Sequence, residues 1–209
     1  MNKKQIHEFF TRLRAQDPEP KSDLEYTNDY TLLVAVVLSA QSTDVGVNKA
    51  TKALFQSVDT PEKMVALGLE GLKSHIKIIG LYNNKAKNVI ALSEMLVEQY
   101  GGDIPSTRET LMALPGVGRK TANVVLNVAL GEPTMAVDTH IFRVGNRLNM
   151  APGKTPEAVE MKLLEVIPQE FALHAHHWLI LHGRYTCTAR KPKCDICSVR
   201  DICPYEGQS

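Results

Sequence analysis

The chain has 209 residues, of which 44% are hydrophobic, and its formal net charge at pH 7 is +1. This composition is ordinary for a globular protein with one good core or two small ones, and the charge by itself indicates no nucleic-acid partner. The longest apolar run, Leu32–Leu38, is too short to span a bilayer, and the polar N-terminus does not resemble a signal peptide. We therefore expect a cytoplasmic protein with no membrane partner.

Helical spacing dominates the chain, and no convincing strand is present. Apolar residues from Ile6 to Leu13 predict an N-terminal helix that the segment 17–20 ends. The segment 29–40 is predicted as a helix, with a buried strand as the less favoured alternative. The sequence thus indicates an all-α protein with a boundary near residue 133. Further helices are predicted through 47–55, from 60, at 69–79, at 85–100, at 138–148, from 155 to about 168, and at 171–185.

The stretch Leu114–Ala122 reads Leu-Pro-Gly-Val-Gly-Arg-Lys-Thr-Ala and predicts a helix-hairpin-helix. Ser106 and Glu109 have capping-box spacing and open a short helix that a proline stops. Gly116 and Gly118 carry no Cβ, so the backbone can turn tightly there and approach another molecule closely. A second helix follows to residue 130, with a glycine suited to its C-cap. Free amides at its start would form an anion site that suits a phosphate.

Lys120 lies in the first turn of this second helix, next to Arg119 and to the positive end of the helix dipole. Both neighbours favour a neutral amine, and a neutral lysine is a nucleophile suited to Schiff-base formation. The alternatives are an ordinary turn between helices and a solvated lysine. Asp138 follows downstream as the expected N-cap of the next helix.

All four cysteines lie near the C-terminus with the spacing C-x6-C-x2-C-x5-C. Without a secretory signal, such a cluster indicates a metal centre before disulfides. One C-x2-C pair flanked by two single cysteines favours a 4Fe-4S cluster over zinc. The stretch from Arg184 to Lys193 carries four basic residues and no acid, so it can neutralise phosphates or be a solvated loop. The four cysteines are Cys187, Cys194, Cys197 and Cys203.

These motifs, together with Val137-Asp138-Thr139-His140, closely resemble endonuclease III, the helix-hairpin-helix family of DNA glycosylases and abasic-site lyases in base excision repair. The resemblance covers the chain from Leu38 to Cys203. It implies a two-lobed all-α fold with a DNA cleft between the lobes. One lobe, 22–133, would be a six-helix barrel containing the hairpin at about 107–130. The other would combine 1–21 with 134–209, including an iron-sulfur cluster loop at 187–203.

The resemblance also implies the site. Lys120 would be the nucleophile, Asp138 the essential carboxylate, and the four cysteines the ligands of one 4Fe-4S cluster. Gln41 would fill the gap left by the extruded nucleotide, and Leu81 would wedge the opposite strand. The remaining expected DNA contacts are Gly116, Gly118, Arg119 and Lys191.

The implied activity is removal of oxidised pyrimidines from double-stranded DNA, followed by strand cleavage 3′ of the abasic site through a lysine Schiff base and β-elimination. The alternatives are a monofunctional, adenine-type DNA glycosylase and a non-catalytic DNA-binding module. We expect a monomer. Whether His140 and Asp44 take part is left open.

Overall fold

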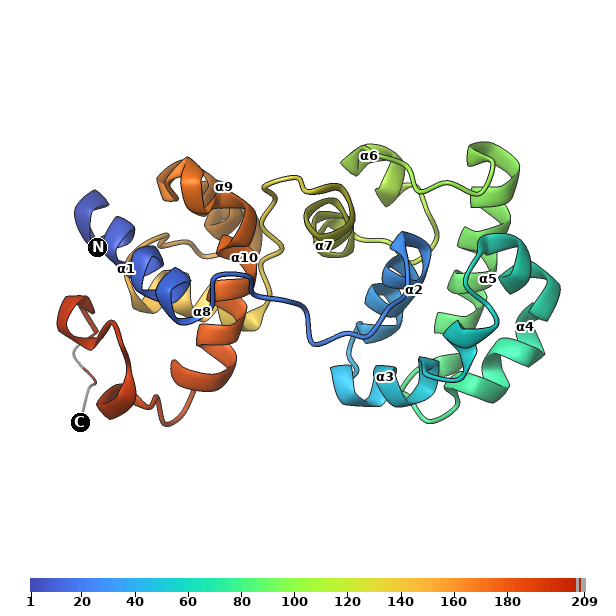
Figure 1. Ribbon diagram of the computed structural model, residues 1–209, viewed down its shortest axis with the longest axis horizontal. Coiled ribbons are helices and arrows are strands. Elements are labelled where there is room, and N and C mark those ends of the chain that lie inside the picture. The colour runs from blue at the N-terminus through green and yellow to red at the C-terminus, as the bar shows by residue number, and fades with distance from the viewer. Residues whose placement is uncertain (206, 208–209) are drawn as a thin grey trace. The chain divides into compact units, whose positions relative to one another are not determined.

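The computed structural model describes residues 1–205 and 207, and within them it contains helices and loops but no strand (Figure 1). The predicted all-α class is confirmed. Contacts divide the chain into a hairpin unit, Ser22–Gly131, and a cysteine unit, Met1–Lys21 with Glu132–Ser209. The expected second lobe also includes residues 206, 208 and 209, which lie outside the described part of the chain.

The hairpin unit is built around α2 (Asp29–Ser39), in which every residue from Tyr30 to Leu38 is buried. Asn28 caps this helix through its side chain and the backbone N–H of Thr31. A helix that is apolar on all sides must be covered on all sides, so α2 lies among other helices (Figure 1). The expected helix is confirmed and the strand alternative is wrong. The surrounding helices are α3 (Asp44–Thr51), α4 (Pro61–Ile76), α5 (Tyr82–Tyr100), α6 (Arg108–Met112) and α7 (Arg119–Leu130).

One predicted break in the hairpin unit is present and one predicted cap is not. The helices expected from 60 and at 69–79 both lie in α4, which a non-helical residue, Gly68 with φ 71°, divides between them. The cap of α6 is Thr107 and not Ser106, because the Thr107 hydroxyl accepts a hydrogen bond from the Thr110 N–H at 3.2 Å. The predicted capping box of Ser106 and Glu109 is therefore wrong by one residue.

The cysteine unit packs α1 from the start of the chain against helices from its end. Phe10 of α1 stacks on Phe171 with ring centroids 5.7 Å apart, and both rings are fully buried. The indole N–H of Trp178 donates to the carbonyl of Asp17 at 2.7 Å, which holds the end of α1. The helices of this unit are α1 (Lys3–Gln16), α8 (Thr139–Arg147), α9 (Pro156–Val166) and α10 (Ala172–Leu181).

The last long helix covers nearly all of the predicted span 171–185, but it is not a regular α-helix throughout. Regular α10 stops at Leu181, and the chain continues as a π-helical turn over His182–Thr186 before reaching Cys187. The remaining described residues form short 3-10 turns and loops. In the described part of the chain, no helix is both long and apolar enough to cross a lipid bilayer.

Candidate active site and cysteine pocket

The hairpin between α6 and α7 contains two glycines, and the lack of a side chain has a different consequence at each. Gly116 has φ 79°, and a Cβ there would lie 2.9 Å from the Asn88 side chain, so folding itself requires glycine. Gly118 has an ordinary φ of −91°, and a Cβ there would meet nothing within 4 Å. The absent side chain at Gly118 therefore leaves open space next to the backbone at the start of α7.

The first turn of α7 presents backbone N–H groups without a side-chain cap. Gly118 is the N-cap residue and can supply no side-chain acceptor. Within the described part of the chain, the N–H groups of Gly116 and Gly118 donate no hydrogen bond. Donors without a partner at the start of a helix are what the predicted anion site requires.

Lys120 is the second residue of α7, and its side chain is exposed. Among the described residues, its amine makes no hydrogen bond or ion pair. Arg119, the residue before it, is half-buried. An amine with no competing acceptor, next to a bend with free amides, is available to a bound molecule.

Asp138 is the N-cap of α8, as predicted. Its Oδ1 accepts hydrogen bonds from the backbone N–H of His140 at 2.9 Å and of Ile141 at 2.8 Å. The other carboxylate oxygen accepts no hydrogen bond within the described residues, and the side chain is half-buried. The helix thus fixes the carboxylate through one oxygen and leaves the second oxygen available. Lys120 belongs to the hairpin unit and Asp138 to the cysteine unit.

Gln41 and Leu81 share an unusual backbone conformation. Both are exposed and have positive φ, 55° for Gln41 and 59° for Leu81, which side chains other than glycine rarely adopt. A hydrogen bond of 2.6 Å from Lys85 Nζ to Ser42 Oγ connects the loop of Gln41 with the first turn of α5, which Leu81 precedes. The fold therefore joins the two predicted insertion loops, although nothing in the sequence indicates this bond.

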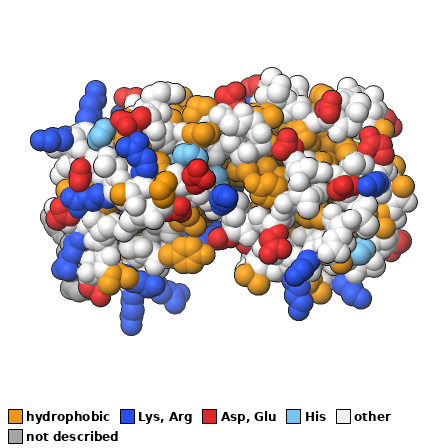
Figure 2. All heavy atoms as spheres, in the orientation of Figure 1, with side chains coloured by type: hydrophobic (Ala, Val, Ile, Leu, Met, Phe, Trp, Pro, Cys, Tyr) orange, Lys and Arg blue, Asp and Glu red, His pale blue; other side chains and the backbone are white. Residues whose placement is uncertain are grey.

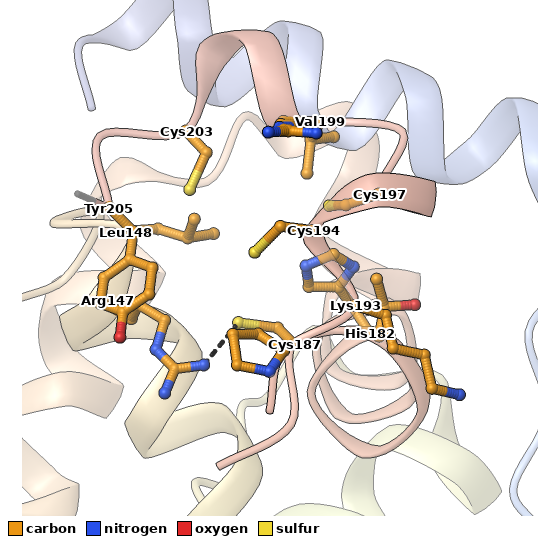
Figure 3. Close-up of a pocket in the computed structure, with 13 residues that line it drawn as sticks. Arg147, Leu148, His182, Cys187, Lys193, Cys194, Cys197, Val199, Cys203 and Tyr205 are labelled. Carbon is orange, nitrogen blue, oxygen red and sulfur yellow. Dashed lines mark hydrogen bonds between the residues drawn. The ribbon is translucent and has the colours of Figure 1, made fainter. Parts of the chain in front are cut away.

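The four cysteines line one pocket in the cysteine unit, and their sulfur atoms point into it (Figure 3). Leu148 and Val199 supply apolar surface beside them. Cys187 is buried and the other three cysteines are half-buried. Among the described residues, no three His, Cys, Asp or Glu side chains converge as ligands of a single metal ion. Four thiols around one pocket instead fit a cubane, which takes one thiolate at each iron.

None of the four cysteines forms a disulfide. Burial raises the pKa of the Cys197 and Cys203 thiols above the ordinary value, and the neighbouring cysteines act in the same direction. The protein alone therefore keeps these two thiols protonated at neutral pH. A cluster would bind the thiolate forms, so its binding would be coupled to the release of these protons.

Two arginines one turn apart on α8 bind the chain around Cys187. Arg143 donates to the carbonyls of Gly183, at 2.6 Å, and Cys187, at 3.0 Å. Arg147 donates to Cys187 Sγ at 3.3 Å and to the carbonyl of Thr188 at 2.8 Å (Figure 3). Neither arginine belongs to a motif of the sequence, although their i, i+4 spacing places them on one helix face.

Three further residues have definite positions. Lys191 is exposed in the loop between Cys187 and Cys194, and its carbonyl accepts a hydrogen bond from Thr188 Oγ1 at 2.6 Å. His140 Nδ1 lies 3.2 Å from an Arg143 nitrogen. Asp44 is the first residue of α3, but the side chain that caps this helix is Thr43. Figure 2 shows basic side chains on both units, interspersed with acidic ones, in agreement with the small net charge.

Comparison with known families matches two parts of the chain. Residues 34–169 match the HhH-GPD superfamily of base excision DNA repair proteins. Residues 187–203 match the iron-sulfur binding domain of endonuclease III. The second match begins and ends at the outer cysteines of the pocket, and it confirms the predicted 4Fe-4S cofactor. The zinc alternative is wrong.

Full-length relatives agree with these matches. The chain is 58% identical over 206 residues to endonuclease III of Haemophilus influenzae, covering 99% of this chain and 98% of the relative. It is equally similar to endonuclease III of Escherichia coli, with the same coverage. A solved structure of a trapped covalent endonuclease III–DNA intermediate superposes with a TM-score of 0.89 at 44% identity, covering 98% of this chain and 96% of that one. The chain therefore belongs to the endonuclease III family of helix-hairpin-helix DNA glycosylases and abasic-site lyases, whose members act in base excision repair.

Proposed function

We propose that this protein removes oxidised pyrimidines from duplex DNA and cuts the strand 3′ of the resulting abasic site, with Lys120 as the nucleophile and Asp138 as the essential carboxylate. The observation that carries the proposal is the exposed Lys120 amine, which has no acceptor among the described residues and follows the free amides of the hairpin. The related solved structure, a trapped covalent complex with DNA, supports covalent chemistry.

The reaction begins when the nucleotide leaves the base stack. Extrusion costs a few kcal/mol, and this cost is smallest for a damaged, poorly stacked base. Gln41 fills the gap in the strand that carries the lesion, and Leu81 wedges the opposite strand. Their exposure and their constrained backbones support this role, because side chains on a fixed backbone insert with less loss of conformational entropy.

Asp138 and Lys120 then act on the same sugar. As the bond between C1′ and the base breaks, positive charge develops on the sugar, and the unpaired oxygen of the Asp138 carboxylate stabilises it. The Lys120 amine forms a bond to C1′, and the base leaves with the electron pair and takes up a proton. The sugar ring opens to a Schiff base, which loses a C2′ proton and expels the 3′ phosphate by β-elimination. Water finally releases the lysine.

The remaining expected DNA contacts bind the phosphate backbone. The N–H groups of Gly116 and Gly118, with Arg119, would hold a phosphate at the start of α7, where the missing Cβ of Gly118 permits close approach. Lys191 would contact another phosphate from the cysteine loop. These contacts carry no base specificity and add to affinity at every sequence.

The four pocket cysteines would ligate the 4Fe-4S cluster. Cys187, at the end of the π-helical turn, and the three later cysteines would hold it, and the bound cluster would link these two segments covalently. Its role in this proposal would be structural, since the four cysteines flank the loop that carries Lys191. We further propose that the hairpin unit corresponds to the family's barrel lobe and that the protein acts as a monomer on DNA in the cytoplasm.

Borohydride trapping tests the proposal. The wild-type protein is incubated with a duplex that carries one oxidised pyrimidine, beside the variants Lys120→Ala and Lys63→Ala. Lys63 is an exposed lysine of the same unit that pairs with Asp59, so its variant is a matched control for loss of one lysine charge. We expect a covalent protein–DNA product for the wild type and for Lys63→Ala, and none for Lys120→Ala.

Each other outcome changes the proposal in a defined way. Free base without a trapped product would favour the monofunctional glycosylase. Binding without base release would favour a DNA-binding module. A trapped product that persists in Lys120→Ala would assign the nucleophile to another amine.

A further inference from the structure

Lys85 is a buried lysine with an unusually small set of partners. Only 6% of its surface is exposed, and its Nζ donates one hydrogen bond, to Ser42 Oγ at 2.6 Å. Among the described residues no carboxylate pairs with it. Burial lowers the pKa of its amine below the ordinary value, because the charged form is poorly solvated there. A lysine kept in such a place needs a reason other than stability.

Lys85 also lies in the first turn of α5, which makes its position less favourable for a cation. The N-terminal end of a helix carries partial positive charge, and α5 has no acidic residue in its first turn to offset it. An apolar side chain of similar length would avoid both costs. The hydrogen bond to Ser42 is therefore the feature that distinguishes this lysine.

Lys85 is hydrogen-bonded to one of the two insertion-loop residues with positive φ and to the neighbour of the other. Its backbone N–H donates to the carbonyl of Leu81 at 3.1 Å. Its side chain reaches Ser42, the residue directly after Gln41. A non-glycine residue with positive φ persists only where its surroundings hold it in place. One residue thus contacts the neighbourhood of both Gln41 and Leu81.

We propose that Lys85 is a positioning residue that sets the loop of Gln41 against the loop of Leu81, so that the two side chains enter the duplex together. Lys85 acts through its hydrogen bond to Ser42, in which the Ser42 hydroxyl is the acceptor. This inference rests on the proposed function, in which Gln41 and Leu81 act on opposite strands. Without the bond, the Gln41 loop is free to leave its strained conformation before DNA arrives, and extrusion of the nucleotide becomes less favourable.

Three variants test the bond from both ends. Lys85→Met keeps the length and apolar stem and removes the donor. Ser42→Ala removes the acceptor at a half-buried position, and Ser42→Thr keeps a hydroxyl as the matched control. We expect Lys85→Met and Ser42→Ala to fold. The first relieves the desolvation of a buried amine, and the second removes a single oxygen atom.

Two measurements separate positioning from chemistry. The first is 2-aminopurine fluorescence, with the probe opposite a stable tetrahydrofuran abasic analogue in a duplex, where unstacking by the wedge raises the signal. The second is single-turnover kinetics on two substrates: a duplex with an oxidised pyrimidine, and a single-stranded oligonucleotide with a natural abasic site. Only the duplex requires insertion, whereas the single strand requires only the Schiff-base chemistry.

We expect Lys85→Met and Ser42→Ala to slow excision from the duplex about ten-fold, the size expected for one hydrogen bond to a charged group. Both should reduce the fluorescence increase and change single-strand cleavage less than about two-fold. Ser42→Thr should behave as the wild type. The double variant should be no slower than Lys85→Met, because both changes remove the same bond.

Unchanged fluorescence and duplex kinetics in both variants would overturn the inference while leaving the proposed function intact. Equal slowing on both substrates would also overturn it, since that result indicates a general defect of the fold. If the wild type itself neither cleaves the single strand nor excises the damaged base, the proposed function fails and the inference fails with it.

Discussion

The hairpin unit folds from one continuous stretch of chain around α2, whereas the cysteine unit joins the two ends of the chain. In the hairpin unit, the central helix is buried on all sides, and the other helices pack their apolar residues around it. In the cysteine unit, α1 packs on helices that follow it by more than 100 residues, and the last segment has only short turns of its own. The hairpin unit has one continuous apolar core, whereas the last segment of the cysteine unit also depends on long-range polar contacts, and we expect it to depend on the cluster as well.

The polar contacts of the cysteine unit show this dependence. Arg12 of α1 donates to the carbonyl of Ser198 at 2.8 Å and forms an ion pair with Asp201. Both residues lie in the loop 187–203, which contains the four cysteines. Arg147 of α8 holds the same loop from its other end, at Thr188. The loop therefore has attachments on two helices but little apolar core of its own.

Loss of the cluster should have the largest effect and should be confined to one unit. Structural zinc sites contribute about 10 kcal/mol or more to folding, and we expect a cluster held by four cysteines likewise to outweigh a single core substitution. We expect Cys197→Ser to leave residues 182–205 and α1 poorly protected in hydrogen exchange, while α2 keeps its protection. Ile196→Ser is the matched control, because Ile196 is 70% exposed in the same loop. Equal loss of protection in both units would show that they depend on the cluster alike.

Truncation of a core side chain should come next and should separate the units. Phe10→Ala removes a ring that packs on Phe171 and Trp178, and should destabilise the cysteine unit by about 4 kcal/mol. Leu33→Ala in α2 should destabilise the hairpin unit by about 3 kcal/mol. Denaturant unfolding with hydrogen exchange assigns each loss to a unit. The exposed Val45→Ala is the control and should change stability by less than about 0.5 kcal/mol.

The smallest expected effect is a difference in pH response. Burial lowers the pKa of His182 to about 4, so the unfolded chain takes up a proton below pH 6.5 that the native cysteine unit does not. Stability of this unit should therefore fall with falling pH between 6.5 and 4, by about 1 kcal/mol from pH 7 to pH 5.5. His182→Leu should remove this dependence in denaturant unfolding. A slope that persists in the variant would assign it to another group.

The hairpin unit should lose stability at alkaline pH. Burial raises the pKa of Tyr30 well above its usual range, although its hydrogen bond to Ser93 at 2.6 Å acts in the other direction. Above pH 10 the unfolded chain loses a proton that the native unit retains, so stability should fall as pH rises. Tyr30→Phe should lower the free energy of unfolding by about 1 kcal/mol at pH 7 and abolish the fall in stability at alkaline pH. Denaturant unfolding at pH 7 and above pH 10 measures both effects.

Much of the fold could be predicted because it depends on local spacing. The apolar run in 32–38 favours a buried helix over a buried strand, and Gly131 is suited to end α7, where its φ is 67°. Asp138 could be identified as an N-cap from its place before a periodic segment. The boundary errors have local reasons too: Ser106 and Thr107 are both competent caps, and the backbone geometry selected Thr107.

The sequence by itself determined the helical class, the hairpin, the candidate nucleophile Lys120 and the set of four cysteines, because each follows from residue type and spacing within a short stretch. Only the tertiary structure decided which distant residues meet. Lys85 reaches Ser42 across 43 positions, and Arg147 reaches Cys187 across 40. Such contacts depend on how helices pack, and periodicity within one helix carries no information about the partner that its side chains will find.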